Sequence, residues 1–289
     1  MKISHGMDES LAVGGQALIE GVMVRRGERV VICVRDPGGD IQVVRMQQYP
    51  LQWAKPLRGI PVLRGVILLL ETLYFGVKAL LISANIALDE EEEFTGFDYL
   101  VLAGMVLGIT GFFVAVPVLL ANLTNLEGLA YNIADSLLRL GLFTLYLFLV
   151  SRWGEVQRVF QYHGAEHKAI NAYESQGSLD PSTASQQPRL HPRCGTSFLF
   201  ISLATSVVLF SLLPQGTTLI RISYRLALVP LIAGVSYEAL KASSRSEGVL
   251  KLLSYPGLLI QRLTTKEPTL DMLEVAIKAI QTLVNEEEG

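Results

Sequence analysis

Residues 99 to 121 read YLVLAGMVLGITGFFVAVPVLLA, an apolar stretch of 23 residues without a single charged side chain. A helix of about 20 apolar residues crosses the hydrocarbon core of a bilayer. Three more stretches reach about this length with few charges, and they cover 129 to 150, 196 to 214 and 219 to 240. The sequence therefore predicts a mainly α-helical, polytopic membrane bundle with four crossings.

A fifth apolar run, 66 to 88, decides the topology. It contains Glu71 and Lys78, and charged side chains are costly inside lipid. Lys and Arg mark the cytoplasmic side of a membrane protein, and the connectors 122 to 128 and 215 to 218 carry neither. We therefore expect both termini on the cytoplasmic side of the inner membrane, and we interpret 66 to 88 as a re-entrant or interfacial helix.

The overall composition agrees with a membrane protein. Mean hydropathy is +0.39, yet 18% of the residues are charged, which suits a lipid-embedded bundle with a water-facing portion. The net charge is −3 and the basic residues are scattered, so a nucleic-acid-binding surface is not expected. Cys33 and Cys194 show no disulfide-framework spacing, and the first residues contain no apolar core of a signal peptide. The bilayer is the partner that this composition indicates.

The N-terminal region has a different periodicity. Residues 12 to 49 alternate apolar and polar side chains and are interrupted by glycines at Gly14-Gly15, Gly27 and Gly38-Gly39. Alternation of this kind is typical of strands, and Asp36-Pro-Gly-Gly is a turn sequence. We therefore predict a small N-terminal β-meander.

The chain then divides into six segments. They are a β-rich cytoplasmic region (1–50), a membrane-associated or re-entrant helix with an acidic linker (51–98), a transmembrane hairpin (99–151), a cytoplasmic metal-motif segment (152–195), a second transmembrane hairpin (196–240) and a cytoplasmic amphipathic helical tail (241–289). In the tail, Thr269 can cap a helix in which Leu273, Ile277 and Ile280 recur at helical spacing.

The chemistry concentrates in Tyr162-His-Gly-Ala-Glu-His-Lys168. In a helix, His163 and His167 lie one turn apart on the same face, a separation that allows two imidazoles to bind one ion. Glu166 completes a His-x-x-Glu-His pattern, the inverted zincin motif in which the histidines bind zinc and the carboxylate polarises water. The competing interpretation is a pair of imidazoles hydrogen-bonded at the lipid headgroups.

A second pair of donors, His191 and Cys194, follows a Ser-, Gln- and Pro-rich stretch from 175 to 187 that we expect to be a flexible loop. Zn²⁺ accepts nitrogen and sulfur ligands together. If all four donors bind, the site is closed and structural. If three bind, a water molecule occupies the fourth position and Glu166 is the candidate general base.

Three more carboxylates are candidates for an extra ligand or for a hydrogen bond to a ligand. Glu238 is expected at the same membrane face as His163. Glu174 lies about 10 Å, two helical turns, from His167, and Glu20 follows the first predicted strand.

The predicted crossings also contain ionisable residues. Asp135 and Arg139 are spaced to form an ion pair within one helix. Arg221 and Arg225 begin their segment, so we expect both to extend to the outer headgroups.

Three blocks of the sequence carry a family resemblance. Gly14-Gly-Gln-Ala-Leu-Ile-Glu-Gly-Val-Met23, Tyr162-His-Gly-Ala-Glu-His-Lys168 and His191-Pro-Arg-Cys-Gly-Thr-Ser-Phe198 resemble the signature blocks of the YqhQ-like family. These are bacterial membrane proteins of unknown function that are described as predicted metal-dependent enzymes. The resemblance implies a metal-dependent membrane protein and names no substrate.

Two functional hypotheses follow. The first is a membrane hydrolase that uses a zinc-type ion on its cytosolic face against a lipid-linked or membrane-proximal substrate. The second is a non-catalytic scaffold or transporter component in which a closed metal site fixes the segment 152 to 195 to the bundle. Metal-binding motifs alone do not separate these two classes.

Overall fold

The computed structural model describes six stretches of the chain, and these are 13–46, 51–89, 95–177, 179–213, 216–245 and 255–285. Residues 90 to 93 of the predicted acidic linker lie outside them. So do both chain ends, whose side of the membrane therefore stays a prediction.

The N-terminal β-meander is confirmed. Four antiparallel strands pair in sequence order β1-β2-β3-β4. Their bounds are Gly14–Leu18, Gly21–Arg26, Arg29–Arg35 and Ile41–Met46. Tight turns join the strands, with Glu20 and Gly27 in the left-handed backbone region, and the Asp36 side chain accepts a hydrogen bond from the Asp40 N–H at 2.9 Å. These turns fix the register of the strands within the predicted meander.

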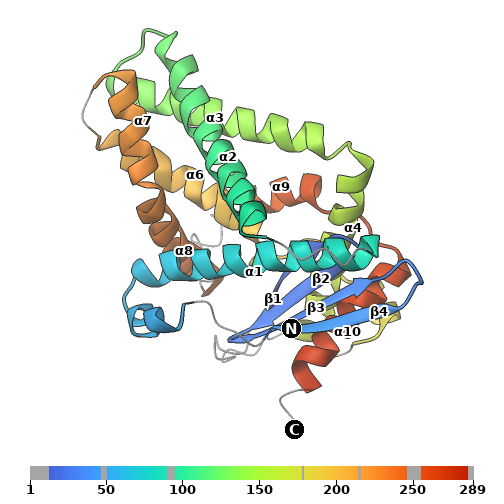
Figure 1. Ribbon diagram of the computed structural model, residues 1–289. Helices are drawn as coiled ribbons and strands as arrows, with labels where there is room; N and C mark the ends of the chain where they lie inside the picture. Colours follow the sequence, from blue (N-terminus) through green and yellow to red (C-terminus); the bar gives the residue numbers. More distant parts are fainter. Residues whose placement is uncertain are drawn as a thin grey trace.

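Helices cover both faces of this sheet (Figure 1). On one face, Met23 and Ile32 pack against Phe75 and Ala79 of α1 (Leu63–Leu88). On the other face, the alternate side chains pack against α4 (Gly154–Gln176) and α10 (Leu270–Asn285). Because both faces are covered, β2 and β3 are buried almost throughout.

The tail helix forms as expected. The Thr269 hydroxyl accepts a hydrogen bond from the Met272 N–H at 3.4 Å at the start of α10. Leu273 and Ile280 are buried beneath the sheet, so the amphipathic face of α10 serves the core of the sheet domain rather than a membrane surface.

The remaining helices include the apolar bundle as well as two short polar helices. These are the 3₁₀ helix η2 (Gln52–Gly59), α2 (Gly96–Asn122), α3 (Gly128–Val150), α5 (Pro181–Ser185), α6 (Gly195–Ser211), α7 (Thr218–Ala227), α8 (Val229–Arg245) and α9 (Tyr255–Thr264). The two polar helices are η2 and α5, of which α5 packs against α4 and α10. Helix α2 packs along α3, α6 packs against α3, α8 and α9, and α8 also contacts α1. The short helix α5, capped by Asp180, lies within the stretch that we expected to be a flexible loop.

The helices suited to cross a membrane agree only in part with the predicted crossings. By length and composition, α1, α2 and α3 can each span a bilayer. Helix α6 has 17 residues and is too short to meet the same criterion. Helices α7 and α8 are bent by 47° relative to each other and give a fourth span only if the two are counted as one broken helix. The mainly helical class with an N-terminal sheet is confirmed, whereas the number of crossings stays a prediction.

The predicted fourth crossing, 219 to 240, is not one continuous helix. Helix α7 ends at Ala227 and α8 begins at Val229. Pro230 has no N–H to donate to the Leu226 carbonyl, and its ring crowds the preceding turn. Pro230 therefore indicates this break in the sequence, although the apolar length of 219 to 240 suggested one continuous helix.

Helix α1 contains the two charges that made its position ambiguous. Glu71 is fully buried, and its carboxylate forms ion pairs with Arg25 of the sheet, at 3.1 Å, and with Arg58 of η2. The half of α1 that follows Glu71 packs on the sheet through Phe75 and Ala79. The sheet therefore covers about half of α1, and whether this helix crosses the membrane stays a prediction.

The buried charges of the bundle are also paired. Asp135 and Arg139 form the expected ion pair at 3.2 Å. The expectation that Arg225 extends to the headgroups is wrong. Arg225 is 1% exposed, and its Nη1 lies 2.6 Å from the Asp135 carboxylate.

Candidate metal centre

Helix α4 presents the two central histidines. It starts at Gly154, after a break that separates it from α3, and it is helical through the whole His-x-x-Glu-His motif. The rings of His163 and His167 are one turn apart, with centroids at 4.4 Å. Cys194 precedes the first residue of α6 and reaches the same place. One donor atom from each of the three residues lies within 4.8 Å of the others.

Backbone carbonyl groups hold both imidazoles. His163 Nδ1 lies 2.8 Å from the Thr264 carbonyl oxygen, and His167 Nδ1 lies 2.7 Å from that of Arg189. A carbonyl oxygen only accepts, so each Nδ1 donates and must carry the proton. In the neutral form of each ring, Nε2 keeps its lone pair, and Nε2 of His163 lies 3.3 Å from Cys194 Sγ. The site thus presents two imidazole nitrogens and one sulfur atom.

Burial supports this protonation state. His167 is 1% exposed, and burial lowers the pKa of its imidazole, while the hydrogen bond with Cys194 acts in the opposite direction. The neutral imidazole is the form that binds metal. The Thr196 hydroxyl donates a hydrogen bond to Cys194 Sγ at 3.4 Å, which helps to hold the sulfur in place.

His191 is a neighbour of this cluster but not one of the three residues. Its ring centroid is 5.8 Å from that of His167, yet its Nε2 faces Glu174 at 3.5 Å, and Glu174 also pairs with Arg193. Gln261 of α9 fixes the backbone of His191 through two hydrogen bonds of 2.9 Å. The described residues therefore offer three clustered donors rather than four.

Glu166 lies on α4 between the two histidines and points toward the sheet. Burial raises the pKa of its carboxyl group to about 7, and His163 acts against that shift. A β-carbon added to Gly15 of β1 would lie 2.6 Å from Glu166 Oε1. Within the described stretches, no hydrogen bond or ion pair to this carboxylate is found, and only burial and the charge of His163 act on its pKa. A buried carboxylate close enough to sense His163 is thus not committed to a structural contact.

The other candidate carboxylates have partners elsewhere. Glu20 forms an ion pair with Arg158, and it accepts a hydrogen bond from the Tyr162 hydroxyl at 3.2 Å. Glu238 of α8 forms an ion pair with Arg64 of α1. Glu20 therefore connects the sheet to α4, and Glu238 connects two helices.

Sequence reasoning missed the groups that orient the cluster. The carbonyls of Thr264 and Arg189 leave no side-chain signal, because any residue type provides them. Gln261 is a polar residue at a fully buried position, and its role depends on a contact 70 positions away. The need for glycine at position 15 had a signal, since Gly15 belongs to the first of the resembling blocks.

Comparison with known proteins assigns the family. Residues 60–286 match the family described as "Protein of unknown function (DUF1385)". The chain belongs to this family. It is also 34% identical over 294 residues to the "Uncharacterized protein YqhQ" of Bacillus subtilis (strain 168), covering 94% of this chain and 92% of that protein. The resemblance to the YqhQ-like family is therefore confirmed. No solved structure matches the chain.

Proposed function

We propose that this member of the DUF1385 family is an integral protein of the cytoplasmic membrane that binds a divalent metal ion, zinc by preference, through His163, His167 and Cys194. In this proposal the protein is a hydrolase, and its substrate is lipid-linked or lies close to the membrane. The observation that carries the proposal is the fixed orientation of both imidazoles, each held at Nδ1 so that Nε2 remains free to bind metal.

The donor set fits zinc. Two ligands at the usual Zn–N and Zn–S lengths of a tetrahedral site lie about 3.5 Å apart, and His163 Nε2 lies 3.3 Å from Cys194 Sγ. Carbonyl groups that accept from the remote ring nitrogen are the usual support for histidine ligands. Three protein ligands leave one position open, as catalytic zinc sites do. A zinc ion bound there would supply Lewis-acid activation of an oxygen atom.

Glu166 is the proposed general base. It precedes His167 on α4, its carboxylate interacts electrostatically with His163, and burial keeps bulk water away from it. Its lack of another partner among the described residues leaves both oxygens available to accept a proton from a water molecule. Gly15 provides the space in which the carboxylate lies.

The proposed position of the site is the cytosolic face. The segment 152 to 195 carries five Lys and Arg residues, whereas the connectors 122 to 128 and 215 to 218 carry none, which agrees with the positive-inside rule. Apolar α2 and α3 would then place α4 just beneath the bilayer, where a lipid-linked substrate is within reach.

A structural metal site is the second candidate. The three donors come from α4 and from the residue before α6, and His163 also contacts the end of α9 through Thr264. A bound ion would therefore fasten α4 to the helical bundle without any reaction. The closed four-ligand version of this idea is disfavoured, because His191 faces Glu174.

Replacing Glu166 with Gln separates the two candidates. We expect Glu166→Gln to keep the metal content of the wild-type protein and to lose the ability to complement a deletion strain, as His163→Ala does. A matched control is Glu155→Gln, which changes an exposed carboxylate in the first turn of the same helix. Full complementation by Glu166→Gln, together with failure of His163→Ala, would indicate a structural metal site instead.

A further inference from the structure

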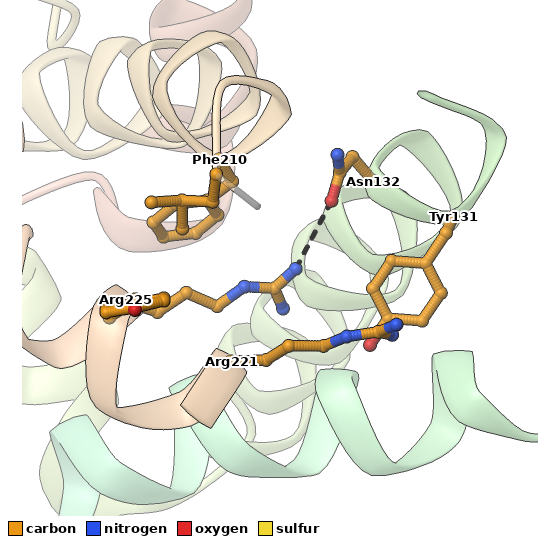
Figure 2. Close-up of a pocket in the computed structure, with 7 residues that line it drawn as sticks. Tyr131, Asn132, Phe210, Arg221 and Arg225 are labelled. Atoms are coloured by element: carbon orange, nitrogen blue, oxygen red, sulfur yellow. Dashed lines mark hydrogen bonds between the residues drawn. The ribbon is translucent and has the colours of Figure 1, made fainter. Parts of the chain in front are cut away.

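A second polar site lies inside the apolar bundle, where α7 meets α3 and α6. Figure 1 shows that α7 lies at the end of the bundle away from α4. The site is a pocket between α3, α6 and α7 (Figure 2). Phe210 and Leu213 form its apolar wall, and Asn132, Arg221 and Arg225 provide its polar groups.

The charges around this pocket do not balance. Arg225 and Arg139 share one carboxylate, that of Asp135, at 2.6 and 3.2 Å. Asp135 is the only acidic residue within the described bounds of α3, α6 and α7. All three side chains are buried, so the group has a net charge of about +1 in apolar surroundings. An unbalanced buried charge is costly, which calls for an additional anion.

Some N–H donors of the two buried arginines are also available to a ligand. The Nε atoms of Arg139 and Arg225 are buried and have no partner among the described residues. Arg225 Nη2 reaches the side-chain amide oxygen Oδ1 of Asn132 only at 3.5 Å. The Phe210 ring lies under both guanidinium groups, at 4.8 and 4.9 Å. Aromatic faces attract a cation but provide no acceptor for its N–H groups.

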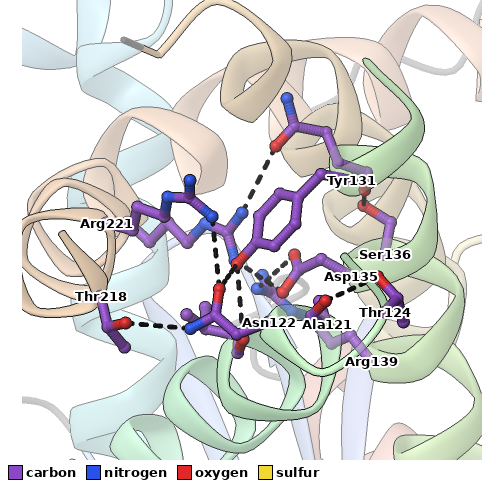
Figure 3. Close-up of polar contacts among 12 residues, drawn as sticks. Ala121, Asn122, Thr124, Tyr131, Asp135, Ser136, Arg139, Thr218 and Arg221 are labelled. Atoms are coloured by element: carbon purple, nitrogen blue, oxygen red, sulfur yellow. Dashed lines mark hydrogen bonds and ion pairs between the residues drawn. The ribbon is translucent and has the colours of Figure 1, made fainter. Parts of the chain in front are cut away.

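Arg221 extends the positive surface toward the mouth of the pocket. It lies one helical turn before Arg225, and its guanidinium covers the Tyr131 ring at 4.3 Å. Figure 3 shows that Asn122 joins Arg221 to Tyr131, with contacts of 3.3 and 3.0 Å. A second guanidinium is thus held in place beside the buried one.

Apolar side chains surround this end of the bundle. Leu212 is 76% exposed and Leu219 is 73% exposed, which is the surface that acyl chains cover in a membrane. Tyr224 lines the pocket and is 43% exposed, as aromatic residues at a membrane interface often are. A ligand of this pocket would therefore sit at headgroup depth.

We propose that the pocket binds a phosphate group through Arg221 and Arg225. Guanidinium groups bind phosphate through paired hydrogen bonds, and one phosphate anion would offset the excess positive charge. The headgroup of an anionic phospholipid is the source that the apolar surroundings favour. Free phosphate has the same chemistry.

Thermal unfolding of the delipidated full-length protein in detergent tests this site. Three probes are compared, and they are short-chain phosphatidylglycerol, short-chain phosphatidylcholine and inorganic phosphate. We expect phosphatidylglycerol to raise the unfolding midpoint more than phosphatidylcholine does, and Arg221→Gln to lose at least half of that rise. A rise with inorganic phosphate as large as with phosphatidylglycerol would support the site and assign it to free phosphate.

The matched control is Arg152→Gln, which removes the same charge from an exposed arginine outside the pocket. It should keep the wild-type response. The proposal is overturned if neither anionic probe stabilises the wild-type protein, if phosphatidylcholine acts as strongly as phosphatidylglycerol, or if both arginine variants respond alike.

A second variant covers the case in which Arg221→Gln does not fold. Leu213→Trp fills the pocket from its apolar wall and changes no charge. It should abolish the response to the anionic probe, and an unchanged response would contradict the proposal.

Discussion

Glu166 of α4 lies directly against Gly15 of β1, so that a β-carbon at position 15 would come within 2.6 Å of Oε1 and 2.9 Å of Cγ. The edge strand thus provides the space for the carboxylate of Glu166, the residue before His167. This contact joins the first and second of the three sequence blocks that carry the family resemblance.

Gly15→Ala should therefore displace Glu166. Forcing a buried side chain from its place costs about 1–3 kcal/mol, so we expect a lower midpoint of thermal unfolding and a loss of complementation with unchanged metal content. Gly14→Ala is the control, because a β-carbon there meets nothing within 4 Å. If the two variants have the same unfolding midpoint and complement equally well, the contact between β1 and Glu166 does not contribute to function.

Gly164→Ala should weaken metal binding from a distance. A β-carbon at Gly164 would lie 2.0 Å from the Lys266 carbonyl oxygen, so the segment that carries the Thr264 carbonyl must shift away from His163. Loss of such a support costs about tenfold in metal affinity or more. Competition with a zinc chelator would measure this. Gly154→Ala, at an open position on the same helix, should bind zinc as the wild-type protein does.

The two cysteines should differ sharply in reactivity. Cys33 lies in the sheet core, fully buried, and burial raises the pKa of its thiol to about 12. Below that pH it stays a neutral thiol, which is a poor nucleophile. Iodoacetamide at pH 8 followed by peptide mass spectrometry should find Cys194 modified and Cys33 intact, with faster modification after metal removal. Equal labelling of both would show that the sheet core is open.

Asp135→Asn should destabilise the bundle. It leaves Arg139 and Arg225 buried without their shared carboxylate, and breaking a buried ion pair costs about 3–5 kcal/mol. Thermal unfolding in detergent would measure the loss. Glu127→Gln, at the exposed residue before α3, should have little effect. An Asp135→Asn protein as stable as this control would mean that the buried charges are neutralised in another way.

Local periodicity carried much of the sequence-based account. Alternation and the Asp36-Pro-Gly-Gly turn predicted the meander, and a spacing of four predicted that His163 and His167 share a face of α4. Cys194 was predicted as their partner from its donor type alone, across 31 positions. These inferences depend on short-range geometry or on the chemistry of the donors, which a sequence states directly.

What the sequence could not provide are contacts fixed by tertiary packing. His191 turns to Glu174 because Gln261, 70 positions away, fixes its backbone. Arg225 is buried because α7 packs against the helices that enclose Asp135, although its position at the start of an apolar run suggested a snorkelling side chain. The break before Pro230 is different, because the proline was visible in the sequence, but the apolar length of 219 to 240 led to the prediction of one helix.

The central claim is that three side chains, and not His191, bind a metal ion. Elemental analysis of full-length protein purified in mild detergent without chelators tests it directly. We expect about one zinc per chain in the wild-type protein, with loss of zinc in His163→Ala, His167→Ala and Cys194→Ser and retention in His191→Ala. A wild-type protein without bound metal, or a His163→Ala variant that keeps its full metal content, would contradict the account.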